Sequence, residues 1–262
     1  MPIECPISFP RLKREAFREL DFRVMKRAFE THGALGRNCE EEIYHHELAG
    51  RLDADGFAPS QVEVPIRVRH GSFLKEYRID LVVATQAIYE LKAVRTLLSA
   101  HEGQTMNYLL LTDCEHGKVV NFGGPSVASR FVNNPLTRDE RYRFKMVMQD
   151  WSGPESLRSA LVNLIEDIGL FLESSLYNQA LVHHYGPENA LVRRPMVLGG
   201  RQLGNQSFQL SAPDEAFRVT TLSQRNRAQR TSLEKLLVLG NLKALHWINL
   251  NHHQVELTTL TR

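Results

Sequence analysis

The segment that most constrains the fold of this 262-residue chain is R-I-D-L-V-V-A-T-Q-A-I-Y-E-L-K, residues 78–92. Residues 79–83 are predicted to form one strand, and 84–86 a short turn into the next. An antiparallel pair joined in this way would bring Asp80 alongside Glu90. The chain is therefore expected to build a sheet in which neighbouring strands deliver two carboxylates to one point.

Alternation along the second strand separates a polar site from the core. Glu90 and Lys92 share one face, while Leu91 between them points into the opposite, apolar layer. Two adjacent carboxylates repel each other unless a cation lies between them, and hard oxygen ligands suit Mg²⁺ or Mn²⁺. The pattern indicates phosphodiester hydrolysis. The alternative is a solvated strand face with an ordinary Glu and Lys.

Each residue type has a place in that chemistry. A metal ion held by Asp80, Glu90 and the Leu91 carbonyl would act as a Lewis acid on the phosphate and lower the pKa of a bound water. Lys92 would orient that water and stabilise the charge that develops in the transition state.

Further sequence blocks accompany this segment in a fixed order along residues 20–131. They are F-E-T-H-G-A-L-G (29–36), E-E-I-Y-H-H-E-L (41–48), V-E-V-P-I-R-V (62–68), H-E-G-Q-T-M-N-Y-L (101–109) and G-K-V-V-N-F-G (117–123). This region resembles the GxxExxY proteins, a branch of the PD-(D/E)XK nuclease superfamily. The resemblance implies an α/β fold with a restriction-endonuclease-like (PD-(D/E)XK) core, a mixed β-sheet flanked by helices.

The resemblance also implies a catalytic set of one helix residue and three strand residues, Glu41, Asp80, Glu90 and Lys92. Asp80, Glu90 and Glu41 would bind the metal ion, Mg²⁺ or Mn²⁺. The placement of Glu41 rests on Tyr44 three residues later. Asn38 stands where the family has its first glycine, and asparagine also tolerates a left-handed backbone.

The Q-x-x-x-Y pattern on the next predicted helix is similar to that of RecB-like nucleases and lambda exonuclease. Gln104 and Tyr108 are four residues apart, so they lie on one helix face and would brace the site and touch the substrate. His101, one turn earlier, is a candidate substrate contact; the alternative is a position at the start of the helix. This likeness implies an enzyme directed to ends or single strands.

Adjacent histidine pairs occur at 45–46, 183–184 and 252–253. Neighbouring residues on a helix point in different directions, so such a pair cannot chelate one metal ion as an i, i+4 pair does. We therefore interpret them as surface histidines.

The second half of the chain, from Trp151, repeats the organisation of the first. An amphipathic stretch at 157–181 precedes extended segments at 190–198, 207–210 and 216–222, a helix at 228–239 and a strand at 244–250. Asn249 stands where Asn121 stands in the first half. We predict a core duplicated in tandem, with a nuclease-like domain at 1–133 and a degenerate repeat at 151–262.

The repeat has lost the polar site. We align the two halves through Gly71 and Gly200. In this alignment Gln209 stands at the position of Asp80, and Val219–Thr221 at that of Glu90–Lys92. Ser232 takes the position of Gln104, Leu236 that of Tyr108, and Glu173 lies near that of Glu41. A metal ion needs its carboxylates. This half is therefore expected to be catalytically silent, to keep a packing or substrate-holding role, and to form an internal pseudo-dimer with the first.

The segment 134–150 is polar and basic with one proline, as is typical of a linker. Its basic and aromatic side chains would grip a nucleic-acid backbone and stack a base; they include Arg138, Arg141, Tyr142 and Arg143. An arm that docks its aromatic side chains between the two domains is an equal alternative.

Composition narrows the class of protein. The hydrophobic content of 42% is ordinary for a globular chain, and three cysteines without CxxC spacing argue against a disulfide framework or structural zinc. The N-terminus lacks a signal-peptide pattern, and there is no run of about twenty apolar residues. A cytoplasmic protein with no membrane partner is expected.

The formal net charge is only +2, but basic residues crowd residues 11–27. They would either contact phosphates or form a solvated helix face paired with neighbouring acids. Taken together, the sequence predicts a metal-dependent nuclease that acts on DNA. The alternatives are a catalytically silent nucleic-acid-binding protein and an assembly protein on a nuclease scaffold.

Overall fold

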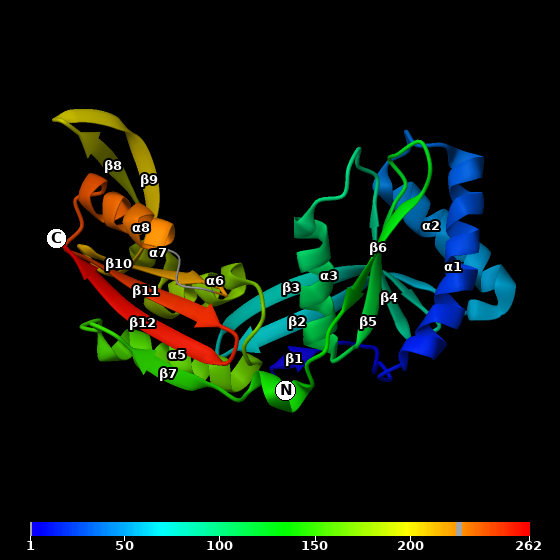
Figure 1. Ribbon diagram of the computed structural model, residues 1–262, viewed down its shortest axis with the longest axis horizontal. Helices are drawn as coiled ribbons and strands as arrows, with labels where there is room; N and C mark the ends of the chain where they lie inside the picture. Colours follow the sequence, from blue (N-terminus) through cyan, green and yellow to red (C-terminus); the bar gives the residue numbers. More distant parts are fainter. Residues whose placement is uncertain (1, 224–226) are drawn as a thin grey trace. The chain divides into compact units, whose positions relative to one another are not determined.

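The computed structural model describes residues 2–223 and 227–262, which form two compact units. The first unit contains the chain up to Val68 and Leu74–Arg138, and the second contains Arg69–Phe73 and Asp139–Arg262. Each unit is built on one mixed sheet covered by helices (Figure 1). Within the described residues, no helix is long and apolar enough to cross a membrane.

The sheet of the first unit has the strand order β1-β2-β3-β4-β5-β6. Its strands are β1 (Ile3–Glu4), β2 (Gln61–His70), β3 (Phe73–Val83), β4 (Ala87–Lys92), β5 (His116–Asn121) and β6 (Ala128–Asn133). β3 and β4 are antiparallel, β4 and β5 are parallel, and β5 and β6 are antiparallel. The prediction of a mixed sheet flanked by helices is confirmed.

Helices cover both faces of this sheet. They are α1 (Arg14–Leu35), α2 (Glu41–Leu52) with the π-helical turn η1 (Asp53–Phe57), and α3 (Ser99–Thr112). Figure 1 shows α1 and α2 on one face and α3 on the other. Leu91 and Tyr89 of β4 are buried in the core under α1 and α2. On the opposite face α3 packs closely, since a Cβ at Gly117 would lie 3.1 Å from the Leu109 side chain.

The sheet of the second unit has the order β7-β12-β11-β10-β9-β8. Its strands are β7 (Lys145–Met148), β8 (Leu191–Leu198), β9 (Arg201–Ala212), β10 (Glu215–Thr220), β11 (Ala244–Asn251) and β12 (Gln254–Thr261). β9 and β10 are antiparallel, β10 and β11 are parallel, and β11 and β12 are antiparallel. From β2 to β6 and from β8 to β12, the two sheets therefore share one strand order.

The helices of the second unit follow the same sequence along the chain. They are α4 (Arg138–Arg141), α5 (Glu155–Ile168), α6 (Ser174–Tyr185), α7 (Pro187–Ala190) and α8 (Arg227–Leu239). α8 buries Leu233 and Leu237 against Leu245 and Trp247 of β11. In the first unit α1 and α2 precede β2, and α3 precedes β5. In the second unit α5 and α6 precede β8, and α8 precedes β11; α4 and α7 are additional short helices.

A tyrosine makes the same two hydrogen bonds in each unit. Tyr44 Oη donates to the Gly36 carbonyl at 2.9 Å and accepts from the backbone N–H three residues after that glycine at 3.2 Å. Tyr177 Oη donates to the Gly169 carbonyl at 2.7 Å and accepts from the corresponding N–H at 3.3 Å. In both units this tyrosine fixes the turn that connects the paired helices.

An asparagine also has the same role in both sheets. Asn121 Oδ1 accepts from Val94 N at 2.9 Å, and its Nδ2 donates to Val94 O at 2.7 Å. Asn249 Oδ1 accepts from Leu222 N at 2.9 Å, and its Nδ2 donates to Leu222 O at 3.0 Å. Each asparagine holds the chain where it leaves the neighbouring parallel strand.

The segment predicted as a linker, residues 134–150, contributes ordered structure instead. Lys145–Met148 forms β7, an edge strand that runs parallel to β12 in the second sheet. This strand has only four residues, so its pattern of apolar residues is too short to distinguish a strand from a connecting segment.

Candidate catalytic site

The strand pair β3–β4 places Asp80 and Glu90 as the alternation of their strands predicts. Leu81 pairs with Tyr89, and the Asp80 carboxylate accepts a hydrogen bond from Leu91 N at 2.8 Å. Asp80 and Glu90 are both buried. Since Leu91 belongs to the core under α1 and α2, the two acidic side chains lie on the α3 side of the sheet.

Lys92, the last residue of β4, lies at the centre of a group of oxygen atoms. Its Nζ lies 2.6 Å from Glu90 Oε1 and 3.1 Å from Asp80 Oδ2. The same Nζ lies 3.1 Å from Glu41 Oε1 and donates to the Leu91 carbonyl at 2.9 Å. Residues from α2, β3 and β4 therefore converge on a single cation.

Glu41 is the first residue of α2 and connects that helix to the end of β4. Its Oε2 accepts from Ala93 N at 3.2 Å, while its Oε1 contacts Lys92. A carboxylate in the first turn of a helix is also stabilised by the helix dipole. The local fold thus holds Glu41 at the edge of the strand pair.

The electrostatics of the site show an excess of negative charge. Burial, followed by the charge of Asp80, raises the pKa of Glu90 to about 8, although Lys92 opposes the shift. Among the described residues, neither Glu90 oxygen has a hydrogen bond of good geometry, although Oε1 lies 2.6 Å from the Lys92 ammonium. Glu90 is therefore mostly protonated at neutral pH, and the ammonium faces the carboxylates of Asp80 and Glu41; this surplus of acidic groups favours a further cation.

Lys92 itself remains protonated in this setting. Burial alone would lower the pKa of Lys92, but the charges of Glu90 and Asp80 outweigh it and the pKa is raised. Lys92 is therefore a hydrogen-bond donor and a positive charge, and it cannot serve as a general base at neutral pH.

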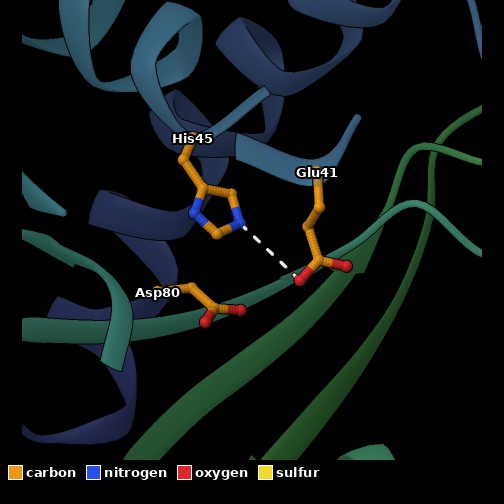
Figure 2. Close-up of side chains that lie close together, drawn as sticks. All are labelled: Glu41, His45 and Asp80. Atoms are coloured by element: carbon orange, nitrogen blue, oxygen red, sulfur yellow. Dashed lines mark ion pairs between the residues drawn. The ribbon is translucent and has the colours of Figure 1, made fainter. Parts of the chain in front are cut away.

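His45 joins this group, and its prediction as a surface residue was wrong. His45 is 4% exposed, whereas its neighbour His46 is exposed. Figure 2 shows the His45 ring and the Glu41 carboxylate side by side from α2, with Asp80 beside them from β3. Ligand atoms of these three residues all lie within 4.8 Å of one another, as donors to one metal ion would.

Both ring nitrogens of His45 lack a hydrogen-bond partner in the described part of the chain. Nε2 lies 4.0 Å from Glu41 Oε1, and Nδ1 lies 3.7 Å from Glu63 Oε1. A buried imidazole whose two nitrogens both lack a hydrogen bond is unusual unless the ring binds a ligand or a metal ion. The signal in the sequence was the spacing of four between Glu41 and His45, which the adjacent His46 obscured.

The donor atoms fit a divalent cation. Carboxylate and carbonyl oxygens suit Mg²⁺ and Mn²⁺, and a neighbouring imidazole favours Mn²⁺ over Mg²⁺. The buried Glu90 oxygens and His45 nitrogens without hydrogen bonds support this assignment independently of sequence resemblance.

Gln104 and Tyr108 lie on one face of α3, as their spacing predicts. Gln104 Nε2 donates to Tyr108 Oη at 2.8 Å. Tyr108 is buried, and its pKa is raised, first by burial and then by the charge of Glu90. The phenol thus lies within electrostatic reach of the acidic group. His101 Nδ1 accepts from Leu98 N at 3.2 Å, so its ring caps the start of α3 in this structure.

The basic segment predicted to bind nucleic acid divides into two groups. Arg138 and Arg143 are exposed. Arg141 is 2% exposed, and its guanidinium donates to the Ile168 and Leu170 carbonyls at the end of α5. Its prediction as a phosphate contact was wrong, because a buried guanidinium that satisfies helix carbonyls is not available to a ligand. Tyr142 Oη donates to the carbonyl of Asp167.

The second unit carries other residues at the corresponding positions. The matched asparagine bonds align Arg218–Thr220 with Glu90–Lys92, one residue earlier than counting along the sequence predicts. The reason is the choice of glycine: Gly71 is the first residue of the turn between β2 and β3, and the first residue of the turn between β8 and β9 is Gly199, not Gly200. The matched tyrosines likewise align Ser174 with Glu41, so Glu173 is not its counterpart.

Comparison with known proteins gives one family match. Residues 18–132 match the family model of the PD-(D/E)XK nuclease superfamily, which indicates a nuclease-type domain there. The crystal structure of SSO0001 is similar to this chain at 18% identity and a TM-score of 0.25, over 47% of this chain and 81% of that one. No curated protein matches this chain significantly.

Proposed function

We propose that the domain matching the nuclease superfamily is a metal-dependent nuclease that hydrolyses the phosphodiester bonds of DNA. The observation that supports this best is the convergence of Glu41, Asp80 and Glu90 on the Nζ atom of Lys92. A cluster of this kind would be costly to bury for structural reasons alone, because three carboxylates share one ammonium.

Glu41, Asp80 and Glu90, with the Leu91 carbonyl and His45, would hold the metal ion. Bound there, Mg²⁺ or Mn²⁺ would polarise the scissile phosphate and lower the pKa of a coordinated water. The raised pKa of Glu90 implies that this carboxyl releases a proton when the ion binds.

Lys92 would act on the substrate directly. Because its pKa is raised, its ammonium can donate to the attacking water or to a phosphate oxygen and stabilise the negative charge that develops. Its present partners hold it at the end of β4, close to the carboxylates. Tyr108, fixed by Gln104, would brace the same side of the sheet.

We infer that the second unit is a degenerate copy of the first. The shared strand order and the matched tyrosine and asparagine bonds support this. At the aligned positions Ser174 replaces Glu41, Arg218 replaces Glu90 and Thr220 replaces Lys92. Without carboxylates this unit would be catalytically silent and would hold substrate or stabilise the protein, with the two copies forming an internal pseudo-dimer.

The test is cleavage of end-labelled single-stranded, double-stranded and nicked DNA, and of RNA, with Mg²⁺, Mn²⁺ or EDTA. Asp80→Asn and Lys92→Ala should abolish cutting. Glu76→Gln is the matched control, since Glu76 is an acidic residue of the same strand that pairs with Arg67 and Arg78 outside the site. Cutting that survives EDTA and both site variants would refute the proposal.

A catalytically silent nucleic-acid-binding protein is the remaining alternative. It predicts DNA binding that weakens with salt and does not depend on a divalent ion, with no cleavage under any condition. An assembly protein would show neither DNA binding nor cleavage.

A further inference from the structure

The hairpin of the second unit, β8 and β9, is a two-stranded ribbon that extends past α8 (Figure 1). All side chains from Val197 to Ser207 are exposed, so this part of the ribbon has no core on either face. A two-stranded ribbon in water is marginally stable by itself. An exposed ribbon of this kind is typical of a binding element.

The ribbon is basic and contains no acidic residue. Residues 191–213 include Arg193, Arg194 and Arg201 but no Asp or Glu. Arg194 donates to the Pro213 carbonyl. In the described chain, Arg193 and Arg201 have no ion pair or side-chain hydrogen bond and are exposed. Their charges are therefore available to an anionic partner.

The shape of the ribbon is regular and twisted. Leu198 pairs with Arg201 across a two-residue turn in which Gly199 and Gly200 have φ of 56° and 77°. Turns with positive φ at both central residues match the right-handed twist of the strands they join. A register shift at Met196 and Val197 adds further twist.

The ribbon combines these charges with exposed leucine and amide side chains. Leu198 is 59% exposed and Leu203 is 50% exposed, and the same ribbon carries exposed amide side chains at Gln202, Asn205 and Gln206. A groove of double-stranded DNA offers phosphates at its edges, and base edges and thymine methyl groups at its floor. The arginines of the ribbon match the phosphates, its amide side chains match the base edges, and its leucines match the thymine methyl groups.

We propose that the β8–β9 ribbon binds double-stranded DNA by lying in the major groove, with Arg193 and Arg201 on backbone phosphates. The major groove is about 12 Å wide and admits a two-stranded ribbon. Arg193 and Leu198, the partner of Arg201, are five residue steps and about 17 Å apart along β8, so the two arginines project from opposite faces of the ribbon and would reach phosphates on opposite edges of the groove. This inference rests on the proposed function, which makes DNA the substrate.

The test uses the full-length double variant Arg193→Gln/Arg201→Gln. Fluorescence anisotropy in EDTA would measure its binding to a duplex of roughly 30 base pairs and to single-stranded DNA of equal length, between about 50 and 200 mM salt. We expect duplex affinity to fall about tenfold or more, and the slope of log K against log salt to decrease by about two. Single-strand affinity should change less.

The matched control is Arg158→Gln/Arg230→Gln, which removes the same charge from exposed arginines paired with Glu155 and Glu234. It should leave duplex affinity unchanged. Equal losses in both double variants would overturn the proposal, because net charge alone would then explain them. Unchanged duplex binding in the ribbon variant would also overturn it.

A second variant, Leu198→Ser/Leu203→Ser, tests for a protein partner at the same surface. If the wild-type chain self-associates in sedimentation and this variant abolishes self-association without weakening duplex binding, the ribbon is an interface between copies and the proposal is wrong. Weakened duplex binding in a monomeric variant would support it.

Cleavage separates this proposal from the nuclease proposal. The ribbon variant should still cut a short single-stranded oligonucleotide at the wild-type rate, because its site in the first unit is intact. A wild-type chain that cuts nothing but loses duplex affinity in the ribbon variant would refute the nuclease and support the ribbon.

Discussion

Lys92 and Glu90 project from the same face of β4, and Lys92 Nζ lies 2.6 Å from Glu90 Oε1. The same ammonium contacts the Asp80 and Glu41 carboxylates and the Leu91 carbonyl. The end of β4 thus supplies one of the three acidic groups and the cation that holds all three together without a metal ion. This relationship links the stability of the domain to its proposed chemistry.

Lys92→Met should destabilise the protein in EDTA by about 3–5 kcal/mol, because it leaves buried carboxylates without their positive partner. Added Mn²⁺ should restore much of this loss, since the ion would take over the neutralising role. Urea unfolding with and without Mn²⁺ measures both effects.

Arg67→Met is the control for this experiment, because Arg67 pairs with Glu76 at an exposed position on the same sheet. It should cost less than about 1 kcal/mol in either buffer. An equal loss for Lys92→Met in EDTA and in Mn²⁺ would show that the carboxylates do not bind the ion.

Glu90→Gln should change the pH dependence of stability in a defined direction. The folded-state pKa of Glu90 is about 8, above its ordinary value of 4.5. The protonated form is therefore favoured by folding, and this contribution is fully present below pH 4.5 and lost as pH rises through 8. The glutamine variant cannot ionise and keeps its stability over this range.

In EDTA, the free energy of unfolding of Glu90→Gln should therefore increase relative to that of the wild type as the pH rises from 4.5 to about 8, by an amount on the order of a few kcal/mol. Chemical denaturation of both proteins at each pH measures the difference. A difference that stays constant with pH would contradict the raised pKa.

His45→Asn should weaken Mn²⁺ binding by roughly 10–100-fold, the range seen when a group beside a metal site is removed. Asparagine occupies the aligned position in the second unit, Asn178, so this side chain is compatible with the local helix. His46→Asn, on the exposed side of the same helix, is the control and should leave affinity unchanged. Isothermal titration calorimetry compares the three proteins, and equal affinities would remove His45 from the site.

Tyr44→Phe and Tyr177→Phe should each cost about 1–2 kcal/mol, because each deletes the hydroxyl that satisfies a helix-end carbonyl and a turn N–H. Hydrogen exchange read by mass spectrometry should show faster exchange in α1 and α2 for the first variant and in α5 and α6 for the second. If both variants loosened the same unit, the equivalence of the two turns would be refuted.

The strand pair and the proximity of its polar side chains were predictable from the sequence. Alternation along β4 places Leu91 in the core under α1 and α2 and turns Glu90 and Lys92 to the opposite face, and the short turn at 84–86 places Asp80 near them. The spacing of Gln104 and Tyr108 likewise determined their shared face on α3. These features depend on local periodicity, which sequence expresses directly.

Other features depend on the tertiary structure and were missed. His45 is buried because the end of β3 lies opposite α2, which no pattern within the helix reveals. Arg141 is buried because its guanidinium bonds to a carbonyl at the end of α5. Its charge alone had favoured a position on the surface. The position of Arg218 was missed by one residue because two adjacent glycines, Gly199 and Gly200, form the β8–β9 turn, and the sequence does not show which of them corresponds to Gly71.

The most direct test of the central claim is the initial rate of DNA cleavage in Mn²⁺ by wild-type protein, Glu90→Gln and the control Glu76→Gln. We predict that the control retains the wild-type rate and that Glu90→Gln loses at least about a thousandfold, since the site would lack one metal ligand and its charge. Equal rates for all three proteins would show that the cluster around Lys92 does not carry the activity.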